Sequence, residues 1–149
     1  MGKFTTDTIL HKKQVSEIGQ IFVDELIKRL QHHDDSKLKG DEQKLFEDVL
    51  DKQDNVAYGT KDYDSTKEKL RPALILHYGA NSHHPEHFID GINGMNIIDL
   101  VEMFIDWSAA TSRHKDDDIH KSIDINAEKY DLPDALVNIF HNTANDFYL

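Results

Sequence analysis

The chain has 149 residues, 38% hydrophobic and 30% charged, which suits one folded domain and does not suit a disordered chain. A formal net charge of −11 would repel a phosphate backbone, so general nucleic-acid binding is not expected. The absence of cysteine excludes disulfides, thiolate zinc sites and a cysteine nucleophile. No apolar stretch is long enough for a membrane span and no signal peptide is visible, so a cytoplasmic protein is expected.

Apolar residues recur with a helical period along most of the chain and predict about six helices. We expect them at residues 8–31, 41–50, from a cap at residue 65 or 66 to residue 79, and at 97–112, 119–130 and 133–147. The intervening segments 51–64, 81–94 and 113–118 read as a surface loop, an irregular segment and a charged turn. No segment shows the alternation of a strand. The sequence therefore predicts an all-α fold, a single domain over residues 1–149.

Three carboxylates lie on one stripe of the helix expected at 97–112, which is otherwise apolar nearly all round. They are Asp99, Glu102 and Asp106. Buried carboxylates are costly unless they are paired or bind a metal ion. Asp99 has a structural explanation, because Asn96 can cap the helix with Asp99 three residues later.

Asp106 has no such local explanation. Its structural alternative is a buried salt bridge to Arg71 or Arg113. Because ten histidines are available in the chain, we favour metal ligation for Asp106.

A histidine–aspartate pair, His33-Asp34, follows the first expected helix, with Lys37 three residues after the aspartate. An imidazole and a neighbouring carboxylate can bind one cation from two sides, and a nearby ammonium can neutralise a phosphate oxygen. Surface polarity alone is the plain alternative for such a pair.

Four histidines, His77, His83, His84 and His87, occur within eleven residues. A lone histidine on the apolar face of a helix, such as His77, is usually a hydrogen-bonded core residue, and the clustering weakens that interpretation. Since not all four can bind one ion, some must lie behind the ligands or in solvent. We favour His77 and His84 as ligands, then His83 and last His87.

These residues and motifs resemble the HD-domain superfamily, whose members are all-α, metal-dependent phosphohydrolases. The sequence is also similar to an uncharacterised HD-like family of bacteria and their phages, and this resemblance covers nearly the whole chain. The motifs that carry it are HDxSK at residues 33–37, NxHHPEHF at 81–88 and the DxxEMxxDW run at 99–107.

The resemblance implies a fold, a cofactor and a ligand set. The expected fold is one HD-like helical domain, and the expected cofactor is one or two divalent ions, Mn, Fe, Co, Ni or Zn. In one straight helix His11 and His33 would lie about 33 Å apart, so His11 reaches the site only if the helix breaks near Gly19. The metal ligands implied are His11, His33, Asp34, His77, His83, His84 and Asp106.

The expected reaction is hydrolysis of a small phosphoester, with a nucleotide as the substrate that the superfamily suggests. Bound metal would activate water and hold phosphate oxygens, and Lys37 would offset charge on the phosphoryl group. Glu102 or Asp99 would orient the water or act as general base. Three alternatives stay open: a protein that binds metal and nucleotide without turnover, an HD-type di-iron oxygenase, and a structural helical protein that binds no metal.

Overall fold

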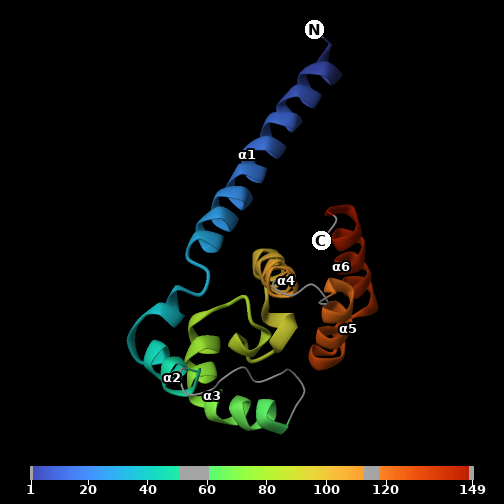
Figure 1. The fold of residues 1–149 in the computed structure, drawn as a ribbon. Coiled ribbons are helices and arrows are strands. Elements are labelled where there is room, and N and C mark those ends of the chain that lie inside the picture. The colour runs from blue at the N-terminus through green and yellow to red at the C-terminus, as the bar shows by residue number, and fades with distance from the viewer. Residues whose placement is uncertain (1, 51–60, 113–117, 148–149) are drawn as a thin grey trace. The chain divides into compact units, whose positions relative to one another are not determined.

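The computed structural model describes residues 2–50, 61–112 and 118–147. Within these ranges the chain is helical and has no strand, which confirms the all-α prediction (Figure 1). Residues 51–60 of the expected loop and 113–117 of the expected turn lie outside the described residues. Residues 61–64, expected in the loop, are helical, so the helix expected from residue 65 or 66 begins earlier than the sequence predicts. The elements are α1 (Lys3–Gln31), η1 (Asp35–Leu38), α2 (Gly40–Leu50), α3 (Lys61–Ala80), η2 (Pro85–His87), η3 (Gly91–Gly94), α4 (Ile97–Thr111), α5 (Ile119–Tyr130) and α6 (Asp134–Phe147).

The chain divides into two units, residues 1–33 and residues 34–149. The first unit is the single helix α1, which begins five residues earlier than the sequence predicts. It continues through Gly19 without a break. His11 therefore lies about 30 Å along the axis from the end of α1 at Gln31. The break that would bring His11 to His33 does not occur, so the expectation that these two residues share an ion is wrong.

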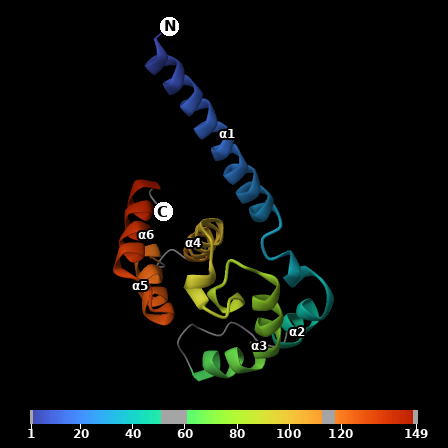
Figure 2. The same ribbon diagram turned by 180° about the vertical axis from the view of Figure 1, so that it is seen from behind.

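The apolar core of the second unit is formed by α4, α5 and α6. Helices α5 and α6 lie side by side in both views (Figures 1 and 2), and α4 packs against α5. The Phe104 and Phe140 rings are stacked with their centroids 5.2 Å apart, and Trp107 meets Phe140 edge-on at 5.7 Å. The buried members of this core are Met103, Phe104, Trp107, Ile119, Ile123, Leu132, Phe140 and Ala144.

Helices α2 and α3 form the other part of the second unit and pack against each other. The 3-10 helices η1 and η2 both contact α3. This arrangement brings the segment that follows Asp34 and the segment that begins at Ser82 to the same helix. It places the residues of two predicted motifs, far apart in the sequence, around the C-terminal half of α3.

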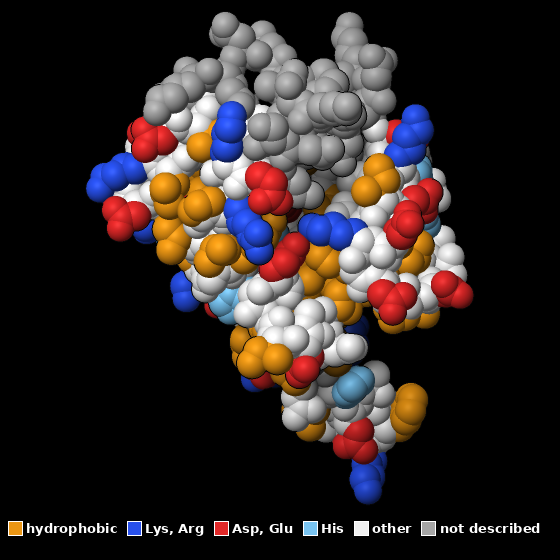
Figure 3. Space-filling model, turned by 90° about the horizontal axis from the view of Figure 1, so that it is seen from below, with side chains coloured by type: hydrophobic (Ala, Val, Ile, Leu, Met, Phe, Trp, Pro, Cys, Tyr) orange, Lys and Arg blue, Asp and Glu red, His pale blue; other side chains and the backbone are white. Residues whose placement is uncertain are grey.

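The surface carries charged side chains of both signs beside hydrophobic ones, as the face in Figure 3 shows. This mixture is in keeping with the 30% charged composition. Among the described residues, no helix is both long enough and apolar enough to cross a membrane.

Candidate metal centre

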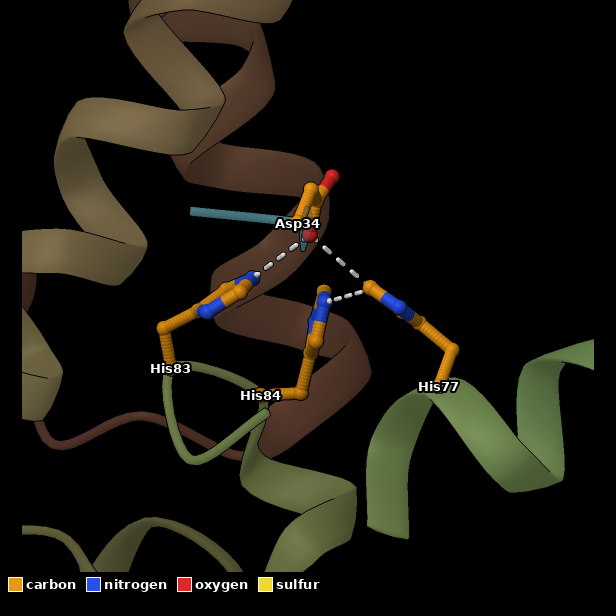
Figure 4. A group of neighbouring side chains, drawn as sticks. All are labelled: Asp34, His77, His83 and His84. Carbon is orange, nitrogen blue, oxygen red and sulfur yellow. Dashed lines mark hydrogen bonds and ion pairs between the residues drawn. The ribbon is translucent and has the colours of Figure 1, made fainter. Parts of the chain in front are cut away.

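Four side chains of the second unit, Asp34, His77, His83 and His84, point toward one common point (Figure 4). One donor atom from each lies within 4.8 Å of those of the other three. His77 Nε2 is 2.8 Å from His84 Nε2 and 3.3 Å from Asp34 Oδ1, and His83 Nε2 is 3.6 Å from the same oxygen. Three imidazoles and one carboxylate are a ligand set for a divalent transition metal ion.

A buried carboxylate orients His77 from behind. Nδ1 of His77 lies 2.9 Å from Oε1 of Glu42, and both side chains are almost completely buried. Because a carboxylate only accepts, Nδ1–H of His77 donates this bond, and the lone pair of Nε2 faces Asp34 and His84. The Ser36 hydroxyl also donates to Glu42 Oε1 at 3.1 Å, and Asn81 donates to Ser36 Oγ at 2.8 Å. Glu42 is therefore fixed by its own neighbours.

The same arrangement occurs at His83. Its Nδ1 lies 3.2 Å from Oε1 of Glu102 on α4, and both residues are buried. If Nδ1–H of His83 donates to Glu102, the lone pair of Nε2 faces Asp34. Metal-binding histidines usually donate their second ring N–H to a carboxylate or a carbonyl in this way.

The orientation of His77 and His83 directs lone pairs toward Asp34 Oδ1, which is itself an acceptor. Acceptors that face one another at 3.3–3.6 Å repel unless a proton or a cation lies between them. A divalent cation bound by all four donor atoms would satisfy them together. The donor set could therefore hold a divalent metal ion, with Glu42 and Glu102 behind two of its histidines.

Protonation of the histidines is disfavoured. Burial, and after it the neighbouring His83 and His77, lower the pKa of His84 to about 3, while Asp106 and Glu86 act in the opposite direction. Burial and then the Lys37 ammonium lower the pKa of His77, against the opposing effect of Asp34 and Glu42. Both rings are therefore neutral near neutral pH, which is the state that binds metal.

Asp34 occupies an unusual backbone conformation at the start of η1. Its φ of 59° lies in the left-handed region, which aspartate tolerates better than most residues. The Lys37 Nζ donates to Asp34 Oδ2 at 2.6 Å, and the Lys37 amide N–H donates to the Asp34 carbonyl at 2.9 Å. Lys37 thus holds one carboxylate oxygen while the other, Oδ1, faces the histidines.

The loop that carries His83 and His84 is held at both ends. The Ser82 hydroxyl donates to Asp99 Oδ1 at 2.8 Å, and Asp99 Oδ2 accepts from the Asn96 amide at 2.8 Å as part of the capping box of α4. On the other side Glu86 accepts from Lys129 Nζ at 2.9 Å. The histidine pair therefore lies between two anchored residues.

The structure brings together the predicted ligands Asp34, His77, His83 and His84. His33 ends the first unit, and its role as a ligand stays a prediction. Asp106 is half-buried on α4, and one of its carboxylate oxygens lies within 4.8 Å of a ring nitrogen of His83. Its role as a metal ligand also stays a prediction. His87 is exposed and donates to the Tyr78 carbonyl at 2.9 Å, in keeping with its last place among the candidates.

Two predicted catalytic carboxylates have contacts that the sequence did not specify. Glu102 faces His83 Nδ1, which makes it an orienting group for that ring. Asp99 engages Ser82 and the Asn96 amide, so the capping explanation is confirmed and extended to the histidine loop.

Glu42 is the residue that sequence reasoning missed. It is 6% exposed, although glutamate is rarely buried without a partner. A signal was present in the sequence, because Glu42 lies on the same helical stripe as Leu45, Phe46 and Val49. An acidic residue on an apolar stripe, in a chain with clustered histidines, predicts a carboxylate that contacts a histidine.

Comparison with known proteins identifies the family of this chain and no activity. A family model described as "Family of unknown function (DUF5662)" matches residues 1–146. The chain therefore belongs to this family. No curated protein and no solved structure matches it.

Proposed function

We propose that this DUF5662 member is a metal-dependent phosphohydrolase that acts on a small phosphoester, a nucleotide being the substrate class that the HD-like motifs suggest. The observation that carries the proposal is the convergence of Asp34 and three histidines in front of two buried carboxylates, Glu42 and Glu102. A hydrogen-bonded core histidine would explain one buried ring. It does not explain two rings that each face a buried carboxylate on one side and Asp34 on the other.

In the proposed hydrolase, each residue of the site would have its own role. Asp34, His77, His83 and His84 hold the ion, and Glu42 and Glu102 keep two of the rings in the metal-binding tautomer. When bound, the ion lowers the pKa of a water molecule and offsets the charge of phosphate oxygens. Lys37, whose side chain is 39% exposed, holds Asp34 and adds positive charge at the edge of the site.

Asp106 is the carboxylate that we assign to proton transfer. It is half-buried, and one of its carboxylate oxygens lies within 4.8 Å of a ring nitrogen of His83, so Asp106 lies beside the candidate metal centre. Glu102 is less suited to this role because its Oε1 faces His83. A carboxylate at this position could accept a proton from a water molecule that attacks phosphorus and return it to the ester oxygen as the P–O ester bond breaks.

A second function, metal binding without turnover, is favoured by the number of ligands. Four protein donors complete a tetrahedral zinc site and leave no position for water, as in structural zinc sites. An ion that takes six ligands, such as Mn²⁺ or Fe²⁺, would keep two positions open on the same four residues. The identity of the bound metal therefore separates the two functions.

The test combines metal content with hydrolysis. Purified protein is analysed by mass spectrometry for bound metals and then assayed on p-nitrophenyl phosphate and bis(p-nitrophenyl) phosphate with Mn²⁺, Fe²⁺, Co²⁺, Ni²⁺ or Zn²⁺. We expect stoichiometric metal, turnover with six-coordinate ions, and loss of both in His77→Ala and His83→Ala. His87→Ala, an exposed histidine of the same segment, is the matched control and should keep both.

Each failure has a distinct meaning. Bound metal without hydrolysis by any ion supports the binding protein and refutes the hydrolase. Wild-type protein that takes up no metal, even after reconstitution, refutes both functions.

A further inference from the structure

The three histidines of the candidate metal centre differ in what lies behind their rings. Nδ1 of His77 is 2.9 Å from Oε1 of Glu42, and Nδ1 of His83 is 3.2 Å from Oε1 of Glu102. All four of these side chains are buried. A carboxylate in this position orients the ring and makes it a stronger ligand. His77 and His83 are therefore suited to stay bound to an ion throughout a reaction.

His84 has no such carboxylate behind its ring. Its Nε2 lies 2.8 Å from Nε2 of His77, and within the described ranges its ring makes no hydrogen bond to a carboxylate or a carbonyl. Asp106 and Glu86 act on the ring through their charge. The ring is half-buried, and its centroid is 5.0 Å from that of Tyr78. Ring contacts of this kind orient an imidazole less strictly than a hydrogen bond to a buried carboxylate does.

The backbone that carries His84 is fixed on both sides. On one side the Ser82 hydroxyl donates to Asp99 Oδ1 at 2.8 Å. On the other side Pro85 follows, and His84 has the extended backbone that a residue before proline adopts, with φ −102° and ψ 130°. The amide of His84 donates to the Asn81 carbonyl at 3.3 Å. A movement of this imidazole is therefore a rotation about its side-chain bonds, and the loop does not have to open.

The number of donors explains why such a rotation would matter. Four protein donors complete a tetrahedral zinc site, whereas catalytic zinc sites have three protein ligands and one open position. Without His84, the site keeps Asp34, His77 and His83. Two imidazoles and one carboxylate are a ligand set that catalytic zinc sites use. Release of His84 would thus change a closed site into an open one.

We propose that His84 is an exchangeable ligand, which a phosphate oxygen displaces from the ion while the other three protein ligands stay bound. This inference rests on the proposed hydrolase function and adds the route by which a substrate reaches a four-coordinate ion. The step is an exchange of one donor atom for another, in which no covalent bond breaks. When the phosphate leaves, His84 returns and closes the site.

Nuclear magnetic resonance of full-length, nitrogen-15-labelled protein with one equivalent of Zn²⁺ tests the exchange without turnover. Correlations between the carbon-bound ring protons and the ring nitrogens show for each histidine whether Nε2 binds the ion. The probe is inorganic phosphate, added in excess. Before phosphate is added, we expect Nε2 of His77, His83 and His84 to be metal-bound. Afterwards, Nε2 of His84 alone should shift to the range of a free imidazole, with the zinc content unchanged by mass spectrometry.

Variants measure the same difference between the histidines as affinities. Loss of an orienting carboxylate usually lowers metal affinity by about 10–100-fold, so His84→Ala should lose less Zn²⁺ affinity than His77→Ala by about that factor. Competition with a chromophoric chelator gives both values. His84→Ala should also bind phosphate more tightly than wild type in isothermal titration calorimetry, since no protein ligand has to leave. His87→Ala, at an exposed histidine of the same segment, is the matched control and should keep both affinities.

The outcomes separate this proposal from the one on which it rests. Three Nε2 atoms that stay metal-bound in excess phosphate overturn it, and so does release of His77 or His83 instead. A His84 ring that is unbound before phosphate is added, or weaker phosphate binding by His84→Ala, also overturns it. In each of these cases the zinc content shows that the site exists, and the hydrolase proposal stands. Protein that takes up no metal, even after reconstitution, refutes the hydrolase together with this inference.

Discussion

Two regions of the second unit meet on α4 and are built on opposite principles. The face that carries Met103, Phe104 and Trp107 packs into an apolar core, where stability comes from area removed from water. Asp99 and Glu102 on the same helix are just as buried, at 2% and 4% exposure, yet they contact Ser82 and His83. Burial alone therefore does not distinguish the core from the site.

The comparison shows what each kind of burial does. Apolar residues of the core need only close contact with other apolar residues, so other apolar residues of similar total volume would be tolerated there. The buried carboxylates and histidines need specific partners, because a buried charge without one costs several kcal/mol, about 3–5 when a pair is broken. The core thus supplies folding free energy that offsets the cost of burying the polar groups of the candidate metal centre.

The largest effect should come from breaking the core alone. Phe140→Ala removes a ring that contacts both Phe104 and Trp107, so it should lower the free energy of unfolding by about 3–5 kcal/mol. Urea denaturation measures the loss, and metal content per folded molecule should not change. Phe147→Ala, at a residue that is 70% exposed, is the control and should stay within about 0.5 kcal/mol of wild type. Equal losses in the two variants would contradict the assignment of the core.

An intermediate effect should come from breaking the site alone. Glu102→Gln keeps the size of the side chain but removes the charge that faces His83 Nδ1. Loss of such an orienting carboxylate usually lowers metal affinity by about 10–100-fold, and we expect the same for Glu42→Gln. Competition with a chromophoric chelator measures the affinity. Glu128→Gln on the exposed side of α5 should bind metal as wild type does, and an unchanged affinity in Glu102→Gln would show that its contact with His83 does not matter.

The smallest effect should come from the cap that both regions share. Asn96 accepts from the amides of Ile98 and Asp99, so Asn96→Ala should cost about 1 kcal/mol of stability. Because Asp99 also holds Ser82 beside the histidine pair, metal affinity should fall slightly as well. Denaturation and chelator competition are measured on one sample. Asn142→Ala, at an exposed position of α6, should change neither quantity, and a loss of stability without any loss of affinity would separate the cap from the metal centre.

Much of the fold was readable from the sequence because local rules determine helices. The spacing of apolar residues and the Asn96–Asp99 pair correctly placed α4, and α5 was found at its observed bounds. The start of α1 was missed by five residues, since helix ends depend on weak capping preferences. The first unit is one unbroken helix, so His11 lies far along its axis from His33.

The sequence by itself determined the all-α fold and the helix that carries Asp99, Glu102 and Asp106, and it singled out the histidine-rich segment as the candidate site. Only the tertiary structure decided that Asp34, His77, His83 and His84 meet, that Glu42 lies behind His77, and that Glu102 faces a histidine. The physical reason is that helical periodicity depends on residues only a few positions apart, so it can be recognised in the sequence. The contact between Glu42 and His77 joins residues 35 positions apart, and it forms only when α2 packs against α3.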